Sequence, residues 1–212
     1  MSPSGRPKGE SLSAQREGGP LSALGRPKGE ALSAQHEGGP LGPAARIQAL
    51  ATELGARLLA RRLMLAAAES CTGGGIGFAV TQIAGSSAWF DRGFVTYSNA
   101  AKQQMLGVPA ATLRVYGAVS EEVVRAMALG ALARSAAQIA VAVTGVAGPG
   151  GGSRAKPVGT VWFGWALQPA RAATVTLVAE RHLLDGDRAA VRTRSIIVAL
   201  RGLIHLLDDD RT

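Results

Sequence analysis

The chain has 212 residues and a net charge of +8. Apolar residues make up 47% of it, which is enough to form the hydrophobic core of one domain, and the length leaves room for an additional segment. It has a single cysteine, Cys71, so it cannot form an internal disulfide and an oxidising compartment is not indicated. No run reaches the roughly 18 consecutive apolar residues of a membrane helix, and the N-terminus lacks the apolar core of a signal peptide. These features predict a cytoplasmic protein with no membrane partner.

Charge is unevenly distributed along the chain. The first 44 residues carry five basic and four acidic side chains, whereas the rest carries 18 basic and 11 acidic ones. A basic domain attracts anions such as phosphorylated metabolites or nucleic acid. The arginines are scattered, with no dense run typical of a nucleic-acid arm, so we expect an ordinary solvated surface and no nucleic-acid partner.

The N-terminal segment 1–44 contains a duplication. GRPKGESLSAQREGGPL (5–21) returns as GRPKGEALSAQHEGGPL (25–41). Each copy is rich in Gly, Pro, Ser and charge and has almost nothing to bury, which predicts a disordered tail. The tail is interpreted as a dispensable extension, with a linker or binding arm as the alternative.

The predicted domain, 45–210, begins near Pro43. Apolar residues at helical spacing predict a helix over 44–62, and the apolar run 63–68 predicts a buried strand. The strand ends in Glu-Ser-Cys-Thr-Gly-Gly-Gly, and a helix is expected over 76–85. A helix N-terminus at such a junction offers free N–H groups that hold a phosphate or an oxyanion. A Ser/Thr-capped helix after a tight turn is the purely structural alternative.

The next elements bring in a lysine. Residues 93–98 read as a strand and 99–106 as a short helix that contains Lys102. The chain has 19 Arg but only four Lys, and the domain keeps only Lys102 and Lys156. A buried lysine loses its proton and activates a serine, which an arginine cannot do. An exposed Lys102 and an ordinary packing role for Tyr97 remain the alternatives.

The second half of the chain continues the alternation. Ser120 caps a helix expected to reach about Ser135, and 139–145 is a strand that enters a Gly-rich loop. This loop is not a Walker A or a GxGxxG motif, although its N–H groups suit an anion. Two further strands are predicted over 158–166 and 173–183. A last helix from Asp187 to about Leu207 places Arg188 and Arg192 one turn apart, as a pair suited to clamping an anion.

Strands alternating with helices predict a three-layer α/β/α sandwich. The two successive late strands predict a mixed sheet with an antiparallel portion. Histidines are scarce, and His182 in a strand pattern is interpreted as structural. No HExxH motif or paired Cys/His spacing indicates a metal site.

Several motifs together resemble the C-terminal domain of competence-damage-inducible protein A, a family of nicotinamide-nucleotide amidohydrolases. They are AESCTGG (68–74), GSS (85–87), TYSNAAK (96–102), LGVP (106–109), GAVSEEV (117–123), AVTGVAGPGGG (142–152), KPVGTVW (156–162) and GDRAAVR (186–192). The resemblance covers about residues 46–207. It implies hydrolysis of nicotinamide mononucleotide to nicotinate mononucleotide and ammonia, without metal or cofactor, by a protein that forms homodimers.

Roles follow from the matched motifs. The resemblance implies Ser70 as nucleophile, with Tyr97 and Lys102 completing the catalytic set, and Thr144 lining the site. The oxyanion is expected at the N–H groups of Cys71, Thr72, Gly73 and Gly74. Ribose and phosphate are expected at Gly148, Gly150, Gly151, Lys156 and Arg188. Cys71 is the competing nucleophile, and a non-catalytic nucleotide- or DNA-binding module of the same fold is the competing function.

Overall fold

The computed structural model describes residues 41–168 and 174–209. The tail predicted over the N-terminal segment therefore lies, up to residue 40, outside the described residues. The helices are α1 (Pro43–Arg61), α2 (Gly75–Thr81), α3 (Asn99–Leu106), α4 (Ala110–Tyr116), α5 (Glu121–Ala133) and α6 (Arg188–Asp209), with a short 3₁₀ helix η1 (Ser86–Ala88). The strands are β1 (Leu65–Glu69), β2 (Phe90–Val95), β3 (Ile139–Gly145), β4 (Thr160–Leu167) and β5 (Thr176–Leu183).

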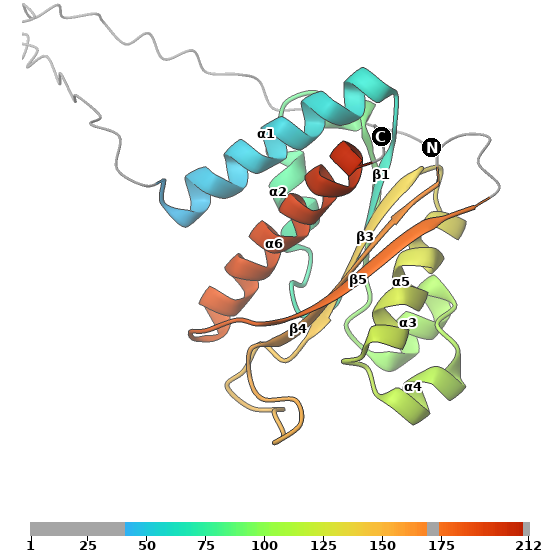
Figure 1. The fold of residues 1–212 in the computed structure, drawn as a ribbon, viewed down its shortest axis with the longest axis vertical. Coiled ribbons are helices and arrows are strands. Elements are labelled where there is room, and N and C mark those ends of the chain that lie inside the picture. Colours follow the sequence, from blue (N-terminus) through green and yellow to red (C-terminus); the bar gives the residue numbers. More distant parts are fainter. Residues whose placement is uncertain (1–40, 169–173, 210–212) are drawn as a thin grey trace, which may run out of the picture. The chain divides into compact units, whose positions relative to one another are not determined.

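The five strands form one mixed sheet in the order β2-β1-β3-β4-β5. β1 pairs parallel with both β2 and β3, whereas β4 pairs antiparallel with β3 and with β5. Helices α1, α2 and α6 cover one face of the sheet, and α3, α4 and α5 cover the other (Figure 1). The predicted three-layer α/β/α sandwich with a mixed sheet is confirmed.

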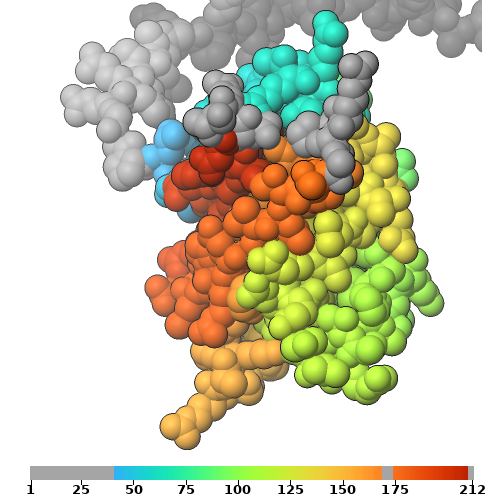
Figure 2. Space-filling model, turned by 45° about the vertical axis from the view of Figure 1, so that its right-hand side comes forward, coloured from blue at the N-terminus to red at the C-terminus, as the bar shows by residue number. Residues whose placement is uncertain are grey.

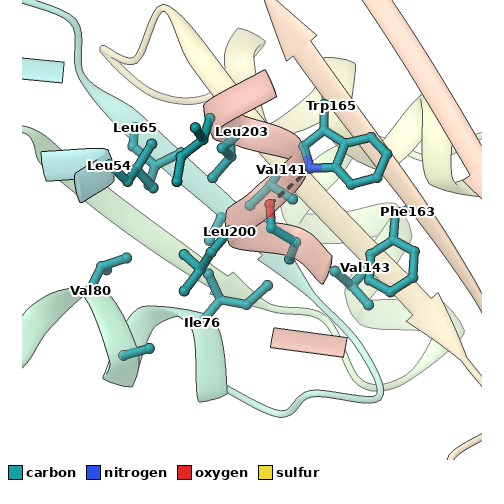
Figure 3. Close-up of a cluster of buried hydrophobic side chains, with 14 of the residues drawn as sticks. Leu54, Leu65, Ile76, Val80, Val141, Val143, Phe163, Trp165, Leu200 and Leu203 are labelled. Carbon is teal, nitrogen blue, oxygen red and sulfur yellow. Dashed lines mark hydrogen bonds between the residues drawn. The ribbon is translucent and has the colours of Figure 1, made fainter. Parts of the chain in front are cut away.

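Alternate residues of the central strands face two different cores. Toward α1 and α6 the sheet presents large side chains, including Leu65, Val141, Phe163 and Trp165, which pack against Leu54, Leu200 and Leu203 (Figure 3). Toward α5 it presents Ala66, Ala68, Ala140, Ala142 and Ala166. Because these alanines are short, α5 lies close to the sheet. On this face the core is filled by the close approach of the α5 and sheet backbones more than by large side chains.

Most predicted elements are confirmed to within a few residues, and α3 is confirmed at both ends. Four boundaries differ by three residues or more. Strand β2 spans Phe90–Val95 rather than 93–98, β5 starts at Thr176 rather than at 173, and α2 stops at Thr81 rather than at 85. Helix α4 was not predicted. Only Leu113 is buried in α4, so its sequence has no apolar periodicity to reveal it.

The topology brings distant segments to one edge of the sheet. The carboxyl ends of β1, β2, β3 and β5 point the same way, so residues that follow these strands meet there. The connection after β1 leaves on the face covered by α2, whereas the connection after β2 leaves on the face covered by α3, and ligands bind at such a switch point in open α/β sheets. The loop between β3 and β4 starts at this edge and projects from the domain (Figure 2).

Candidate active site

A tight turn after β1 places Ser70 at this edge. The Ser70 N–H donates to the carbonyl of Val143 at 3.0 Å, which continues the pairing of β1 with β3. The chain then turns through Gly73 and Gly74, whose φ angles of 59° and 92° lie in the left-handed region that favours glycine. The N–H of Gly73 closes the turn on the Ser70 carbonyl at 3.1 Å. The serine is thus fixed by a strand on one side and a glycine turn on the other.

The buried carboxylate of Glu69 fixes the far end of the same turn. Its two oxygens accept the N–H groups of Ile76 at 3.0 Å and Gly77 at 2.8 Å, in the first turn of α2. Its backbone carbonyl accepts the N–H of Thr96 at 2.7 Å, which links β1 to the segment after β2. Glu69 therefore ties the serine turn to the chain that leads into α3.

Lys102 reaches Ser70 from α3, which begins with the side chain of Ser98 accepting the N–H of Ala101 at 3.0 Å. Lys102 is 1% exposed and points inward from this helix. Its Nζ lies 2.9 Å from Oγ of Ser70 and donates to the carbonyl of Thr96 at 2.7 Å. The hydroxyl and the amine, 32 residues apart, are in hydrogen-bond contact within the protein interior.

Burial shifts the pKa of two side chains beside Ser70, namely Lys102 and Cys71. Burial lowers the pKa of Lys102 below its usual range, an effect partly opposed by the neighbouring Cys71. Burial also raises the pKa of Cys71 to about 11. The lysine is therefore shifted toward a neutral amine, whereas the cysteine is held as an unreactive thiol.

A cavity of about 220 Å³ opens next to this pair. Six of the predicted site residues line it: Ser70, Cys71, Tyr97, Lys102, Thr144 and Arg188. They come from the segments after β1 and β2, from the end of β3, from α3, and from the start of α6. The structure thus assembles residues from more than half the length of the domain into one cavity.

Three side chains define the walls of the cavity. The hydroxyl of Thr144, at the end of β3, donates to the carbonyl of Ala118 at 2.8 Å. Arg188 donates to the Tyr97 hydroxyl at 2.7 Å and to the Gly148 carbonyl at 2.9 Å. In the described part of the chain the Tyr97 hydroxyl has no hydrogen bond to Ser70 or Lys102. Arg188 and Tyr97 therefore join α6 to the edge of the cavity.

The structure separates the residues predicted to hold ribose and phosphate. Gly148 and Arg188 line an adjoining cavity of about 540 Å³, which also shares Ala147 with the Ser70 cavity. Lys156 lines neither of these cavities, and its ammonium donates to the carbonyl of Tyr116 at 2.9 Å. Gly150 and Gly151 are exposed in the projecting loop and line neither cavity.

Both predicted arginines line the larger cavity, but only Arg188 also lines the Ser70 cavity. The guanidinium of Arg192 donates to the carbonyl of Thr72 at 2.8 Å, in the serine turn. The sequence reasoning missed this partner, as it missed Glu69 and the Thr96 carbonyl. Every residue carries a backbone carbonyl, so the sequence does not show which carbonyl accepts a hydrogen bond from a given side chain. Glu69 carried a signal, since a carboxylate shortly before a helix start, here six residues before Gly75, suits the free N–H groups of the first turn.

None of the described histidines lines this cavity. His182 and His205 line a separate cavity between β5 and α6, and His182 Nε2 lies 2.9 Å from the carboxylate of Glu180. His36 lies outside the described residues. Within residues 41–168 and 174–209, no helix is both long enough and apolar enough to cross a membrane.

The fold and the cavity define an α/β protein with a buried serine–lysine pair at the carboxyl edge of its sheet. Residues 47–207 match the family model described as CinA C-terminal domain. The chain belongs to this family.

Relatives and solved structures agree with this assignment. "Nicotinamide-nucleotide amidohydrolase PncC" of Enterobacter agglomerans is 54% identical over 156 residues, which cover 74% of this chain and 92% of the relative. The protein of the same name from Pseudomonas putida is 54% identical over 160 residues, or 76% and 96%. The crystal structure of competence/damage inducible protein CihA from Agrobacterium tumefaciens is 48% identical, with a TM-score of 0.71 over 76% of this chain and 95% of that one.

Proposed function

We propose that this chain is a serine amidohydrolase that converts nicotinamide mononucleotide to nicotinate mononucleotide and ammonia. The observation that carries the proposal is the 2.9 Å contact between the buried Nζ of Lys102 and Oγ of Ser70. Two relatives that share 54% of aligned residues are named nicotinamide-nucleotide amidohydrolases. The reaction class fits a serine that has a buried amine as its base.

Proton transfer begins the reaction. Neutral Lys102 accepts the hydroxyl proton as Oγ of Ser70 attacks the carboxamide carbon, so that one C–O bond forms and the carbonyl becomes an oxyanion. The oxyanion then collapses, the C–N bond breaks, and the ammonium of Lys102 returns the proton to the leaving nitrogen. Water, with Lys102 again as base, hydrolyses the acyl-enzyme to release the carboxylate. The Thr96 carbonyl accepts a hydrogen bond from Nζ at 2.7 Å and so orients the amine.

The oxyanion is held by backbone N–H groups of the serine turn. Thr72 and Gly74 have N–H groups without a backbone or side-chain acceptor in the described part of the chain, whereas the N–H of Gly73 is bound to Ser70 and that of Cys71 to its own thiol. The N–H groups of Thr72 and Gly74 therefore remain available to a ligand. One such donor contributes about 3–4 kcal/mol to a transition state of this kind.

Thr144 orients the carboxamide. Its hydroxyl proton is directed at the Ala118 carbonyl, so its oxygen faces the cavity as an acceptor only. An acceptor at this position suits the NH₂ group of a carboxamide and not the oxygen of a carboxylate. The product acid is therefore bound less well than the substrate amide.

The substrate spans both cavities. About 220 Å³ beside Ser70 is below the roughly 300 Å³ of a typical ligand pocket, so it accommodates the pyridine carboxamide alone. The phosphoribosyl group extends past Ala147 into the larger cavity, where Arg188 and the Gly148 segment bind it. Lys156, Gly150 and Gly151 bind the phosphate only if the projecting loop closes on it.

Ammonia release from nicotinamide mononucleotide by the purified full chain tests the proposal. We expect turnover by the wild type, a loss of at least about 10³-fold in Ser70→Ala, and retention of most activity in Cys71→Ala. The cysteine variant is a matched control because it alters the next residue of the same turn. An active Ser70→Ala protein combined with an inactive Cys71→Ala protein would reassign the nucleophile. Salt-sensitive DNA binding without turnover would favour a binding module.

We also propose a cytoplasmic homodimer. The family resemblance supports the dimer, and the lone, buried Cys71 supports a reducing compartment. Sedimentation equilibrium at two ionic strengths tests the assembly, because a chain that stays monomeric at micromolar concentration contradicts it.

A further inference from the structure

Arg192 supports the serine turn. Its guanidinium donates to the Thr72 carbonyl at 2.8 Å and lies 3.5 Å from the position that a Cβ on Gly73 would occupy. It also acts electrostatically on the neighbouring Cys71, whose pKa it lowers against the larger effect of burial. The positive charge of Arg192 therefore lies next to the turn that carries Ser70.

The Thr72 carbonyl controls the direction of the N–H groups around it. This carbonyl accepts both the Arg192 guanidinium and the N–H of Gly75 at 3.2 Å, while the N–H of the same peptide unit, on Gly73, is bound to Ser70. With both ends of this peptide held, its plane is fixed, and it anchors the two peptide units joined to it. Their N–H groups, on Thr72 and Gly74, are the ones left without an acceptor in the described chain.

We propose that Arg192 is a positioning residue for the amidase reaction: it holds the Thr72 carbonyl so that the free N–H groups of the turn point at the developing oxyanion. The proposal rests on the proposed function. Arg192 also lines the larger cavity beside Arg188, so a direct phosphate contact is the alternative that an experiment has to separate. One guanidinium nitrogen is engaged by a backbone carbonyl, and Nε is buried without a hydrogen-bond partner in the described residues, so the group is aimed at the turn, which favours the positioning role.

The test is steady-state kinetics of ammonia release for Arg192→Gln and Arg192→Lys. A positioning role acts in the transition state, so kcat falls by about 10- to 100-fold in Arg192→Gln while KM changes less than about threefold. Arg192→Lys keeps a cationic donor near Thr72 and recovers part of the lost kcat. A purely structural role would not produce this split or this rescue.

Arg201→Gln is the matched control, because Arg201 is exposed on the same helix and lines the separate cavity between β5 and α6. We expect wild-type kinetics from it. A rise in KM with unchanged kcat in Arg192→Gln overturns the proposal in favour of phosphate binding, and unchanged kinetics overturn it as well. If Arg192→Gln fails to fold by circular dichroism, the lysine variant alone decides, with reduced kcat at unchanged KM expected. A wild-type chain that releases no ammonia instead refutes the proposed function itself.

Discussion

The backbone of Gly130, in the middle of α5, lies against the carbonyl of Leu106, the last residue of α3. A Cβ at Gly130 would overlap the Leu106 carbonyl oxygen and also contact its Cβ. Leu106 is four residues beyond Lys102, so this close approach sets the position of the helix that carries the amine. Gly130 therefore allows α5 and α3 to pack closely, and this packing determines where Lys102 lies in the site.

Gly130→Ala is therefore expected to destabilise the protein. An alanine inside a helix normally gains about 1 kcal/mol over glycine. The overlap here is with a backbone oxygen, so it costs about 3 kcal/mol, which exceeds that gain, and it displaces α3; the net change is therefore unfavourable. Thermal unfolding should show a lower melting temperature, and kcat should fall because Lys102 moves. Leu129→Ala, at the neighbouring exposed position of α5, is the control and should leave kcat unchanged.

Much of this fold could be predicted from sequence because strand and helix periodicities alternate clearly. The strands 63–68 and 139–145 were placed within two residues since they are continuous apolar runs between turn residues. Helix α4 could not be predicted because it buries little more than Leu113 and contains β-branched Thr112 and Val115. Its existence depends on tertiary contacts that local sequence does not encode.

The site was predictable as far as side chains identify it. Ser70, Lys102 and Thr144 occur in motifs, and the strand ends that carry them converge. The partners of Lys156 and Arg192 were not predictable, because each donates to a backbone carbonyl that could have belonged to almost any residue. The positive charge of Lys156 and Arg192 was the sole reason to expect both of them at an anion site.

The left-handed backbone at Gly74 yields a second prediction. Its φ of 92° disfavours any residue with a Cβ, although a Cβ there would have only ordinary contact with Val95 at 3.6 Å. Gly74→Ala should then lower the free energy of unfolding by about 1–2 kcal/mol through backbone strain alone, and should reduce kcat by moving the turn. Chemical denaturation measures the first effect.

Two further variants separate strain from other causes. Gly74→Asn should lose less stability than Gly74→Ala, because asparagine tolerates the left-handed region better. Gly150→Ala has open space and a φ outside the left-handed region, so its stability should equal that of the wild type. Equal losses in the alanine and asparagine variants would argue against backbone strain.

The lowered pKa of Lys102 predicts how activity depends on pH. The base must be neutral, so kcat should rise as pH increases through the folded-state pKa, which burial places below the usual lysine value of 10.5. Lys102→Arg should be as inactive as Lys102→Met, because a guanidinium does not release its proton. A pH–rate profile from pH 6 to about pH 10 checks the first expectation. An active Lys102→Arg protein would mean that no deprotonation occurs at this position.

The same shift predicts a stability difference. When a lysine has a lower pKa in the folded state, the unfolded chain binds more protons between the two pKa values, so this residue's contribution to stability improves as pH rises through that window. Unfolding of the wild type and of Lys102→Met should therefore be compared across pH. The wild type should gain relative to the variant as pH rises toward 10.5, and a flat difference would show that the amine is not perturbed.

The contact of Tyr97 with Arg188 distinguishes two roles for the tyrosine. The 2.7 Å contact indicates that the Tyr97 hydroxyl holds Arg188 at the mouth of the cavity. In that case Tyr97→Phe and Arg188→Gln each remove the same interaction. Their effects on kcat/KM should be strongly non-additive, with a coupling of about 0.5–3 kcal/mol in a double-mutant cycle. If the hydroxyl instead relays protons between Ser70 and Lys102, Tyr97→Phe should cost as much in the Arg188→Gln background as in the wild type. Because Tyr97 is 59% exposed and its hydroxyl faces the arginine, we expect the coupled result, with the larger part of the loss in KM.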